Sequence, residues 1–163
     1  MMDENPATPS DATDVPSGAA TEQVDETPEG TDWLLKTFVE EANARKGDFF
    51  SITLSVGGSV VAGTLVGVSE YFRAIAKSFY SDDETPEEGT WASWLLEAAK
   101  DADDFIDEDP ERTPPARYIH LRDARIHAHG QRPLPTNEGV WWRGKLSSVD
   151  GFWIGRLRVP GED

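Results

Sequence analysis

The stretch that decides the fold is FSITLSVGGSVVAGTLV, residues 50–66. Its first half alternates apolar and hydroxyl-bearing side chains, the period-two pattern of a half-buried β-strand. Gly57-Gly58 favours a tight hairpin turn, because both turn residues must adopt positive φ. The apolar pattern resumes over residues 59–66 with Gly63 inside it. We therefore predict a β-hairpin whose second strand bends, or is closely approached by another backbone, at that glycine.

Helical periodicity flanks this hairpin on both sides. Before it, either Thr31 or Asp32 can cap a helix that ends near Gly47. Its apolar stripe is formed by Leu34, Leu35, Phe38, Val39 and Ala42. After the hairpin, Ser69 is in place to cap a second helix. One face of that helix carries Phe72, Ile75, Ala76 and Phe79.

Residues 81–115 form an acidic insertion with 13 acidic and 2 basic residues. Within it, residues 90–106 keep helical spacing. The side chains expected on the buried face are Trp91, Trp94, Leu95, Ala98, Ala102 and Phe105. The opposite face is strongly acidic, and we expect it to be solvated.

Three further strands are predicted near the end of the chain, over residues 117–129, 140–146 and 152–159. A bulge is expected near Asp123, and Asp150-Gly151 suits a turn in a late tight hairpin. The fold class is therefore α+β: a small five-stranded curled sheet, or an Sm- or SH3-like partly open barrel. It carries an N-terminal helix, a helix after the first hairpin and the acidic helical insertion.

Charge is unevenly distributed along this chain of net charge −16. Residues 1–30 carry 8 acidic and no basic residues, and we expect a disordered acidic tail. Residues 31–160 then form a single domain. Its last third is basic, with 8 basic and 3 acidic residues over 116–161. Segregated charge of this kind favours self-association. The overall charge weighs against nucleic-acid binding and against an anchor on anionic lipid.

The residues offer no recognisable catalytic or metal chemistry. There is no cysteine, which excludes thiolate ligands, disulfides and cysteine nucleophiles, and no serine stands in G-x-S-x-G. Residues 139–145 match the spacing of a phosphate loop, but two tryptophans and a strand pattern exclude that interpretation. His120, His127 and His129 are expected to be ordinary strand residues rather than zinc ligands. We expect a non-enzymatic protein without metal or cofactor, in a reducing cytoplasm and without a membrane span.

The candidate partner-binding residues are tryptophans and bases near the C-terminus: Trp141, Arg143, Lys145, Trp153 and Arg156. Alternation places Trp141 and Trp142 on opposite faces of their strand. One is expected in the core, while the other, beside bases, could stack on a partner or take an acidic segment. The alternative is that these aromatics only fill the core and form cross-strand pairs.

Three stretches resemble the gas vesicle accessory protein U family, GvpU. They are FVEEANARKGDFFSITLSVGGSVVAGTLVGVSEYFRAIAKSF, YIHLRDARI and WWRGKLSSVDGFWIG. The resemblance covers about residues 33–80 and 117–157, with the VDGF turn and the W-R-G-K strand as its most specific parts. The acidic tail and insertion lie outside it.

This resemblance implies a cytoplasmic accessory protein of gas vesicles, the protein-shelled flotation organelles of some prokaryotes. Such proteins are not the main shell subunit, and they associate with vesicles and influence their clustering or assembly. The family brings no cofactor or catalytic residue. Partners would be the vesicle shell, other gas vesicle proteins and further copies of this chain. The alternative function is a small Sm-like barrel that binds nucleic acid or serves as an oligomeric scaffold.

Overall fold

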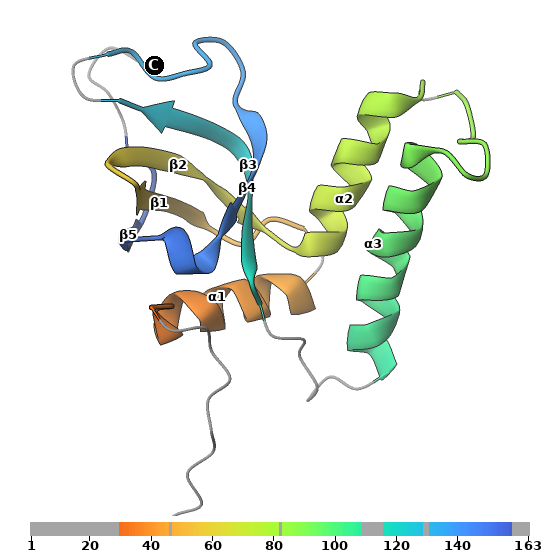
Figure 1. Ribbon diagram of the computed structural model, residues 1–163, viewed down its shortest axis with the longest axis horizontal. Coiled ribbons are helices and arrows are strands. Elements are labelled where there is room, and N and C mark those ends of the chain that lie inside the picture. Colours follow the sequence, from red (N-terminus) through yellow and green to blue (C-terminus); the bar gives the residue numbers. More distant parts are fainter. Residues whose placement is uncertain (1–29, 46, 82, 109–115, 129–130, 158–163) are drawn as a thin grey trace, which may run out of the picture.

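The computed structural model describes residues 30–45, 47–81, 83–108, 116–128 and 131–157 (Figure 1). The predicted acidic tail, except for Gly30, lies outside these residues. The elements follow in the order α1 (Trp33–Ala44), β1 (Ser51–Val56), β2 (Ser59–Val66), α2 (Val68–Ala76), η1 (Lys77–Phe79), α3 (Trp91–Glu108), β3 (Tyr118–His127), β4 (Val140–Lys145), η2 (Leu146–Ser148) and β5 (Gly151–Ile154), where η denotes a 3-10 helix. This confirms the predicted α+β class with a curled sheet.

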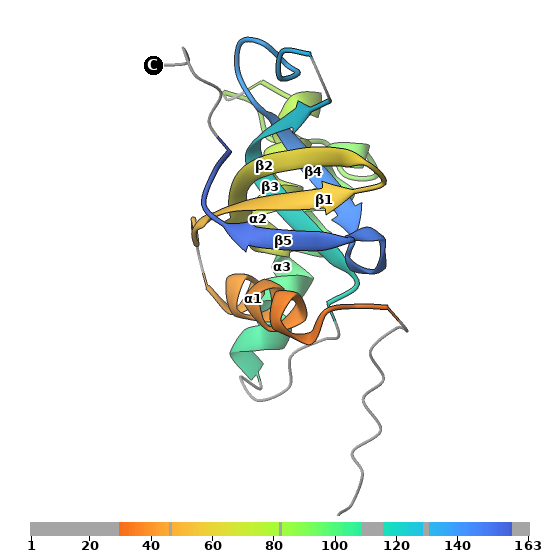
Figure 2. The same cartoon turned by 90° about the vertical axis from the view of Figure 1, so that its left-hand side faces the viewer.

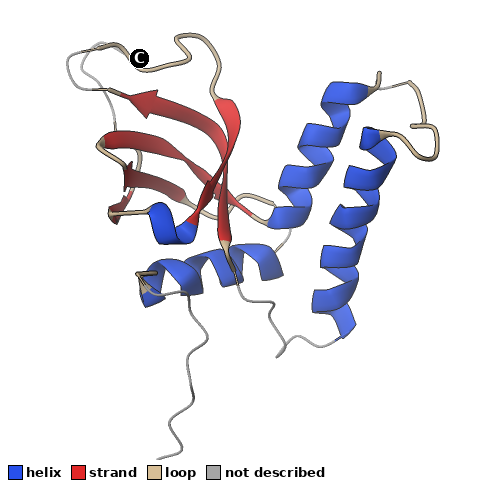
Figure 3. Cartoon of the chain, in the orientation of Figure 1, coloured by secondary structure: helices blue, strands red, loops and turns tan. Residues whose placement is uncertain are grey.

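The sheet is antiparallel throughout and has the strand order β4-β3-β2-β1-β5. It curves without closing, and the strands gather on one side of the molecule while α2 and α3 stand on the other (Figure 3). The predicted first hairpin is confirmed, with Gly57 at φ 55° and Gly58 at φ 80°. Both glycines therefore occupy the left-handed region that a two-residue hairpin turn requires.

The bend expected at Gly63 and the bulge expected near Asp123 are the same feature, seen from two neighbouring strands. The β2–β3 register shifts between Ala62 and Thr64. Asp123 adopts φ 48°, an unusual value for a residue with a side chain. A Cβ atom at Gly63 would lie 3.1 Å from the Arg122 carbonyl oxygen. The close backbone approach is therefore what favours glycine at this position.

Helix α1 begins as predicted, with Asp32 as its N-cap. The Asp32 Oδ1 atom accepts hydrogen bonds from the backbone N–H groups of Leu34 (2.8 Å) and Leu35 (3.1 Å). The helix packs against one face of the curled sheet, next to β5 (Figure 2). The side chains fully buried between α1 and the sheet include Leu35, Val39, Ala42, Ile52, Leu54, Leu65, Ile119 and Leu121.

Helix α2 is capped differently from the prediction. Its N-cap is Gly67, while Ser69 lies buried within the first turn and is not the cap. A Cβ atom at Gly67 would lie 2.7 Å from the Ala42 carbonyl oxygen, so α1 passes too close for a capping side chain there. The acceptor comes from α1 instead, because Asn43 Oδ1 accepts the Val68 N–H at 2.9 Å.

Helix α3 packs on α2 and forms a helical hairpin beside the sheet. The expectation that Trp91 and Trp94 lie on its buried face is wrong, because they are 69% and 56% exposed. Leu95 is buried as predicted, and the other buried side chains described on the helix are Ala92 and Ala99. Because α3 packs chiefly on α2, a narrow stripe of buried side chains along α3 is enough to form that contact. Trp91 and Trp94 therefore lie on a second apolar face of α3, which is exposed.

The prediction of a late tight hairpin is also wrong, because the last two strands, β4 and β5, occupy opposite edges of the sheet. At the end of β4 the side chain of Leu146 is buried. The backbone N–H of Leu146 donates a hydrogen bond to the Arg117 carbonyl oxygen at 3.0 Å. The chain then crosses to the far edge through η2. Asp150 meets the first hairpin there, where its Oδ2 accepts the Gly57 N–H at 2.8 Å.

Strand β5 is shorter than predicted and ends at Ile154. Gly155 adopts φ 109° and turns the chain across β1. There the Thr53 hydroxyl donates to the Gly155 carbonyl oxygen at 2.7 Å and accepts the Leu157 N–H at 3.1 Å. Val159, the predicted end of the strand, lies outside the described residues.

Candidate partner-binding surface

Three of the five predicted partner-binding residues form one row on β4. Trp141, Arg143 and Lys145 alternate along this edge strand, so their side chains share the sheet face that points away from α1. Trp142 points the other way and packs against the buried core. The strand therefore presents the two tryptophans to opposite faces, as predicted, and Trp142 is the core residue.

The two bases of this row, which we call the β4 row, are exposed, and Trp141 is half-buried. The Arg143 guanidinium lies 3.8 Å from the centroid of the Tyr118 ring on β3, a cation–π contact that orients it. Lys145 lines a shallow groove of about 340 Å³ together with Arg117, Tyr118 and neighbouring residues. This end of the sheet therefore offers positive charge beside aromatic rings.

The other two predicted residues lie elsewhere. Trp153 is 44% exposed on β5, in register with Thr53, at the opposite edge of the sheet from β4. Arg156 is held within the fold: its Nη1 donates to Asp123 Oδ2 at 2.5 Å and its Nη2 to the Asp123 carbonyl oxygen at 2.9 Å. The structure thus brings together the β4 row alone.

Asp123 shows why the bulge is ordered. Besides the Arg156 guanidinium, its carboxylate accepts the Gly139 N–H at 3.0 Å, which fixes the entry to β4. Partial burial by itself would raise the pKa of Asp123. The hydrogen bonds and positive charge outweigh this effect and hold that pKa below its usual range.

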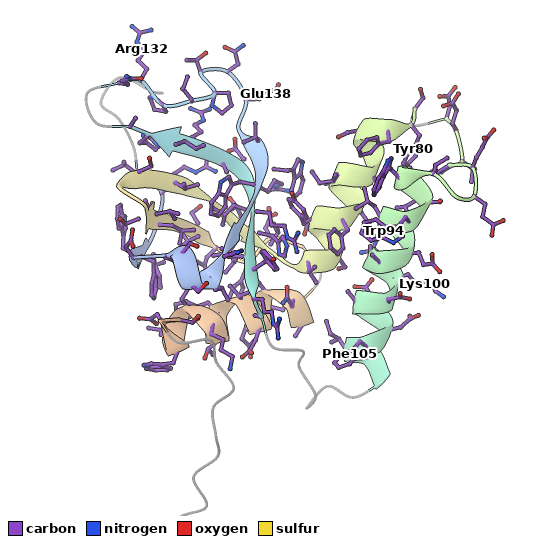
Figure 4. The ribbon with its side chains drawn as sticks, in the orientation of Figure 1. Tyr80, Trp94, Lys100, Phe105, Arg132 and Glu138 are labelled. Atoms are coloured by element: carbon purple, nitrogen blue, oxygen red, sulfur yellow. The ribbon has the colours of Figure 1, made fainter. Side chains whose placement is uncertain are left out.

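Other bases near the β4 row are also engaged by the fold. Arg122 pairs with Asp48 and lies 4.0 Å from Glu70 Oε1, and Arg125 Nη2 donates to the Asn137 carbonyl oxygen at 3.0 Å. Arg132 and Glu138 lie in the loop that joins β3 to β4, at the top of the sheet (Figure 4). Among the bases on the described strands, Arg143 and Lys145 are exposed, whereas Arg122 and Arg125 are half-buried.

The junction between the sheet and the helical hairpin centres on a histidine that sequence reasoning placed on a strand surface. His120 is only 2% exposed, and its ring lies 4.7 Å from Tyr71 and 6.3 Å from Phe72, centroid to centroid. Burial lowers its pKa to about 3, with a further contribution from the charge of Arg143. His120 is thus neutral at physiological pH and serves as packing surface for α2.

The positions of the histidines can be compared with the expectation that they bind no metal. His127 lies on β3, whereas His129 lies outside the described residues. Among the residues described, no group of three histidines, cysteines or carboxylates is placed to hold a metal ion.

The helical hairpin carries the opposite charge to the β4 row. Arg73 on α2 pairs with Asp103 on α3 at 2.5 Å, which ties the two helices together. Glu97, Asp101 and Asp104 are exposed on α3. Sequence reasoning identified this acidic face but missed that Trp91 and Trp94 stand exposed beside it. A second apolar face could have been suspected from the number of large side chains on the helix.

The fold and its surfaces define a small α+β protein with oppositely charged faces and an exposed row of bases on an edge strand. Over residues 32–157 the chain matches the family described as "Gas vesicle protein GvpU-like". That span covers most of the chain, and the chain therefore belongs to the GvpU-like family of gas vesicle proteins. No curated protein and no solved structure matches it.

Family membership confirms the resemblance found in the sequence and makes this a gas-vesicle-related protein. Such membership suggests association with gas vesicle components, and the family is not known as enzymatic. Within the described residues, no helix has the length and apolar character needed to span a membrane.

Proposed function

We propose that this chain is a cytoplasmic, non-enzymatic accessory protein that associates with gas vesicles and with other copies of itself. It modulates vesicle clustering or assembly through many weak contacts between oppositely charged surfaces. The acidic tail over residues 1–30 and the acidic insertion over 81–115 supply the negative charge, and the single domain over 31–160 carries both signs. Many such contacts together give strong avidity.

The observation that carries this proposal is the separation of charge on the folded domain. Exposed Arg143 and Lys145 mark an edge of the sheet, while exposed Glu97, Asp101 and Asp104 mark the outer helix of the hairpin. A single copy presents both surfaces, so each copy can contact neighbours on two sides. Interactions between exposed charges are screened over about 10 Å at 0.1 M salt, and assembly should therefore weaken as salt rises.

The experiment is flotation with intact gas vesicles. The purified chain is mixed with vesicles, and its fraction in the buoyant layer is measured across a salt series. Binding that decreases with salt supports both the association and its electrostatic basis. Binding that is insensitive to salt supports association by another contact. A chain that stays in solution contradicts direct association with the vesicle.

Deletion of residues 1–30 tests what the acidic tail does. If the tail bridges to basic surfaces of neighbours, its removal reduces vesicle clustering, as measured by particle size. If the tail keeps vesicles apart by repulsion, its removal increases clustering. Flotation of the shortened chain is measured beside the full chain, so that a change in clustering is distinguished from a change in vesicle association.

A second candidate function is nucleic-acid binding by the β4 row, which the combination of Trp141 with Arg143 and Lys145 favours. Filter binding with poly-U at low salt tests it. Retention that Arg143→Glu abolishes supports it, whereas an absence of retention at low salt contradicts it.

A further inference from the structure

The exposed face of α3 is suited to contact rather than to solvent. Trp91 and Trp94 lie edge to face, with ring centroids 5.9 Å apart, and both are largely exposed. Phe79, at the end of η1, is also exposed. Exposed aromatic side chains that adjoin one another mark interaction surfaces more often than single exposed apolar residues do.

The two tryptophans line a surface groove of about 1160 Å³ at the N-terminal end of α3. Its lining residues are Glu88, Gly89, Thr90, Trp91, Ser93, Trp94 and Glu97. Both charged residues among them are acidic. Aromatic faces next to carboxylates attract guanidinium and ammonium groups, through cation–π contacts and ion pairs together. The groove therefore fits a positively charged strand or segment that also carries apolar surface.

The rim of this groove is ordered before any partner arrives. The Thr90 N–H donates to the Ser93 hydroxyl at 3.1 Å, and the Ser93 N–H donates to the Thr90 hydroxyl at 3.3 Å. This reciprocal cap fixes the first turn of α3. Trp91 and Trp94 stand on that turn, and Trp94 lies in the upper half of the helix (Figure 4). A fixed rim reduces the entropy lost on binding.

The chain itself carries a surface with the complementary chemistry. The β4 row offers exposed Arg143 and Lys145 beside half-buried Trp141, on a strand at the edge of the sheet. A copy's own row cannot fill its own groove, because α3 turns its buried face to α2, and α2 stands between α3 and the sheet (Figure 1). A contact between the two surfaces must therefore join different copies.

We propose that the groove formed by Trp91, Trp94, Glu88 and Glu97 binds the β4 row of a second copy of this chain. The inference rests on the self-association proposed above and names its two surfaces. Because the groove and the row are different surfaces, the contact is head to tail. Each added copy leaves one groove and one row open, and such contacts produce open-ended assemblies unless the rotation closes a ring.

Sedimentation velocity of the full chain at low salt, without vesicles, tests this contact. The groove variant is Trp91→Gln/Trp94→Gln, and the row variant is Arg143→Glu/Lys145→Glu. The matched control is Trp33→Gln, which removes a tryptophan that is 70% exposed on α1. Circular dichroism confirms that each variant is folded.

We expect the wild-type chain and the Trp33 variant to grow in mean mass with concentration. Each of the other variants should need at least tenfold higher concentration to associate. A mixture of the groove variant with the row variant should form dimers and nothing larger, because one intact groove and one intact row remain. Variants that associate like wild type, a mixture that stays monomeric, or a monomeric wild-type chain would each overturn the inference.

Flotation of the same variants separates this inference from the proposed vesicle association. A groove variant that floats with vesicles but no longer self-associates supports the inference and keeps the association. If the wild-type chain is monomeric and the groove variant loses flotation, the groove binds a basic segment of a vesicle component. That result overturns the inference and leaves the association standing.

Discussion

The Asn43 side chain at the end of α1 caps the next helix in the chain, by accepting the Val68 N–H at 2.9 Å. Gly67, the residue at the N-cap itself, has no side chain to do so. The contact couples α1, which covers the core, to α2, which carries the helical hairpin. This bond therefore acts together with the packing of α2 on His120 to hold the helical hairpin beside the sheet.

Replacement of Asn43 by alanine should lower the free energy of unfolding by about 1–2 kcal/mol, the usual cost of losing a helix cap and leaving its donor unpaired. Urea denaturation measures it. Asn43→Asp is the matched control, since it keeps an acceptor oxygen at the helix N-terminus. An alanine variant as stable as the control would show that the bond does not hold α2 in place.

Replacement of Gly63 by alanine should destabilise the chain by about 1–3 kcal/mol, because its methyl group would press against β3. The nearest atoms would be the Arg122 carbonyl oxygen and the Leu121 Cβ, both at 3.1 Å. Gly151→Ala is the control, as a Cβ atom there meets nothing within 4 Å. Equal urea midpoints for the two variants would contradict the close approach.

The features predicted well from the sequence are those fixed by local chemistry. The Gly57-Gly58 turn and the Asp32 cap each depend on residues within a few positions of one another. The irregularity at Gly63 and Asp123 involves two strands distant in the sequence, but each strand carries its own local sign of it. The family was recognisable for the same reason, since the most specific parts of the resemblance are two short stretches, the VDGF turn and the W-R-G-K strand.

The features predicted wrongly depend on where distant segments meet. Asp150-Gly151 is a turn-forming pair, but the pair itself does not show which strands it joins. Leu146 is buried at the end of β4, and the chain then crosses to the opposite edge of the sheet. Ser69 is a good cap by type, but the approach of α1 at Gly67 moved the start of α2. The helix predicted over α3 was correct. Its periodicity could not show that packing on α2 buries only the apolar side chains in line with Leu95, so that the tryptophans remain exposed.

The residues predicted to bind a partner divide in the same way. The β4 row was predictable because alternation along one strand places Trp141, Arg143 and Lys145 on one face. That Trp153 stands at the other edge follows from strand order. That Arg156 is paired with Asp123 follows from the turn at Gly155, which no local pattern indicated.

Stability should depend on pH through His120. Its ordinary pKa is 6.5 and burial lowers this to about 3 in the folded chain. The unfolded chain therefore binds more protons between these values, and the free energy of unfolding decreases as the pH falls from 6.5 toward 3. This group alone contributes a slope of at most about 1.4 kcal/mol per pH unit.

The variant His120→Phe should remove that slope, and urea titrations between pH 7 and pH 4 measure it. It should also be at least as stable as wild type at pH 7, because neither His120 ring nitrogen has a hydrogen-bond partner among the described residues. His127→Gln, on the same strand, should keep the slope that His120 causes. If the free energy of unfolding of the wild-type chain and of His120→Phe varied with pH in parallel, the burial of His120 would be contradicted and its ring would contact water.

The pair formed by Arg156 and Asp123 should act in folding rather than in partner binding. Its two hydrogen bonds pin the segment after β5 onto the bulge of β3. In a double-mutant cycle with Arg156→Met and Asp123→Asn, we expect a coupling of about 0.5–1 kcal/mol, since both side chains remain partly exposed. Asparagine is chosen because it tolerates the positive φ at position 123.

The pH dependence of this pair has a defined sign. The pKa of Asp123 is held below its ordinary value of 3.8, so its stabilising contribution is present above that value and is lost as the pH falls through the lower, folded pKa. The coupling should vanish there, and Arg132→Met, in the loop between β3 and β4, should leave it unchanged. If Arg156→Met weakens vesicle flotation without lowering stability, Arg156 belongs to the binding surface after all.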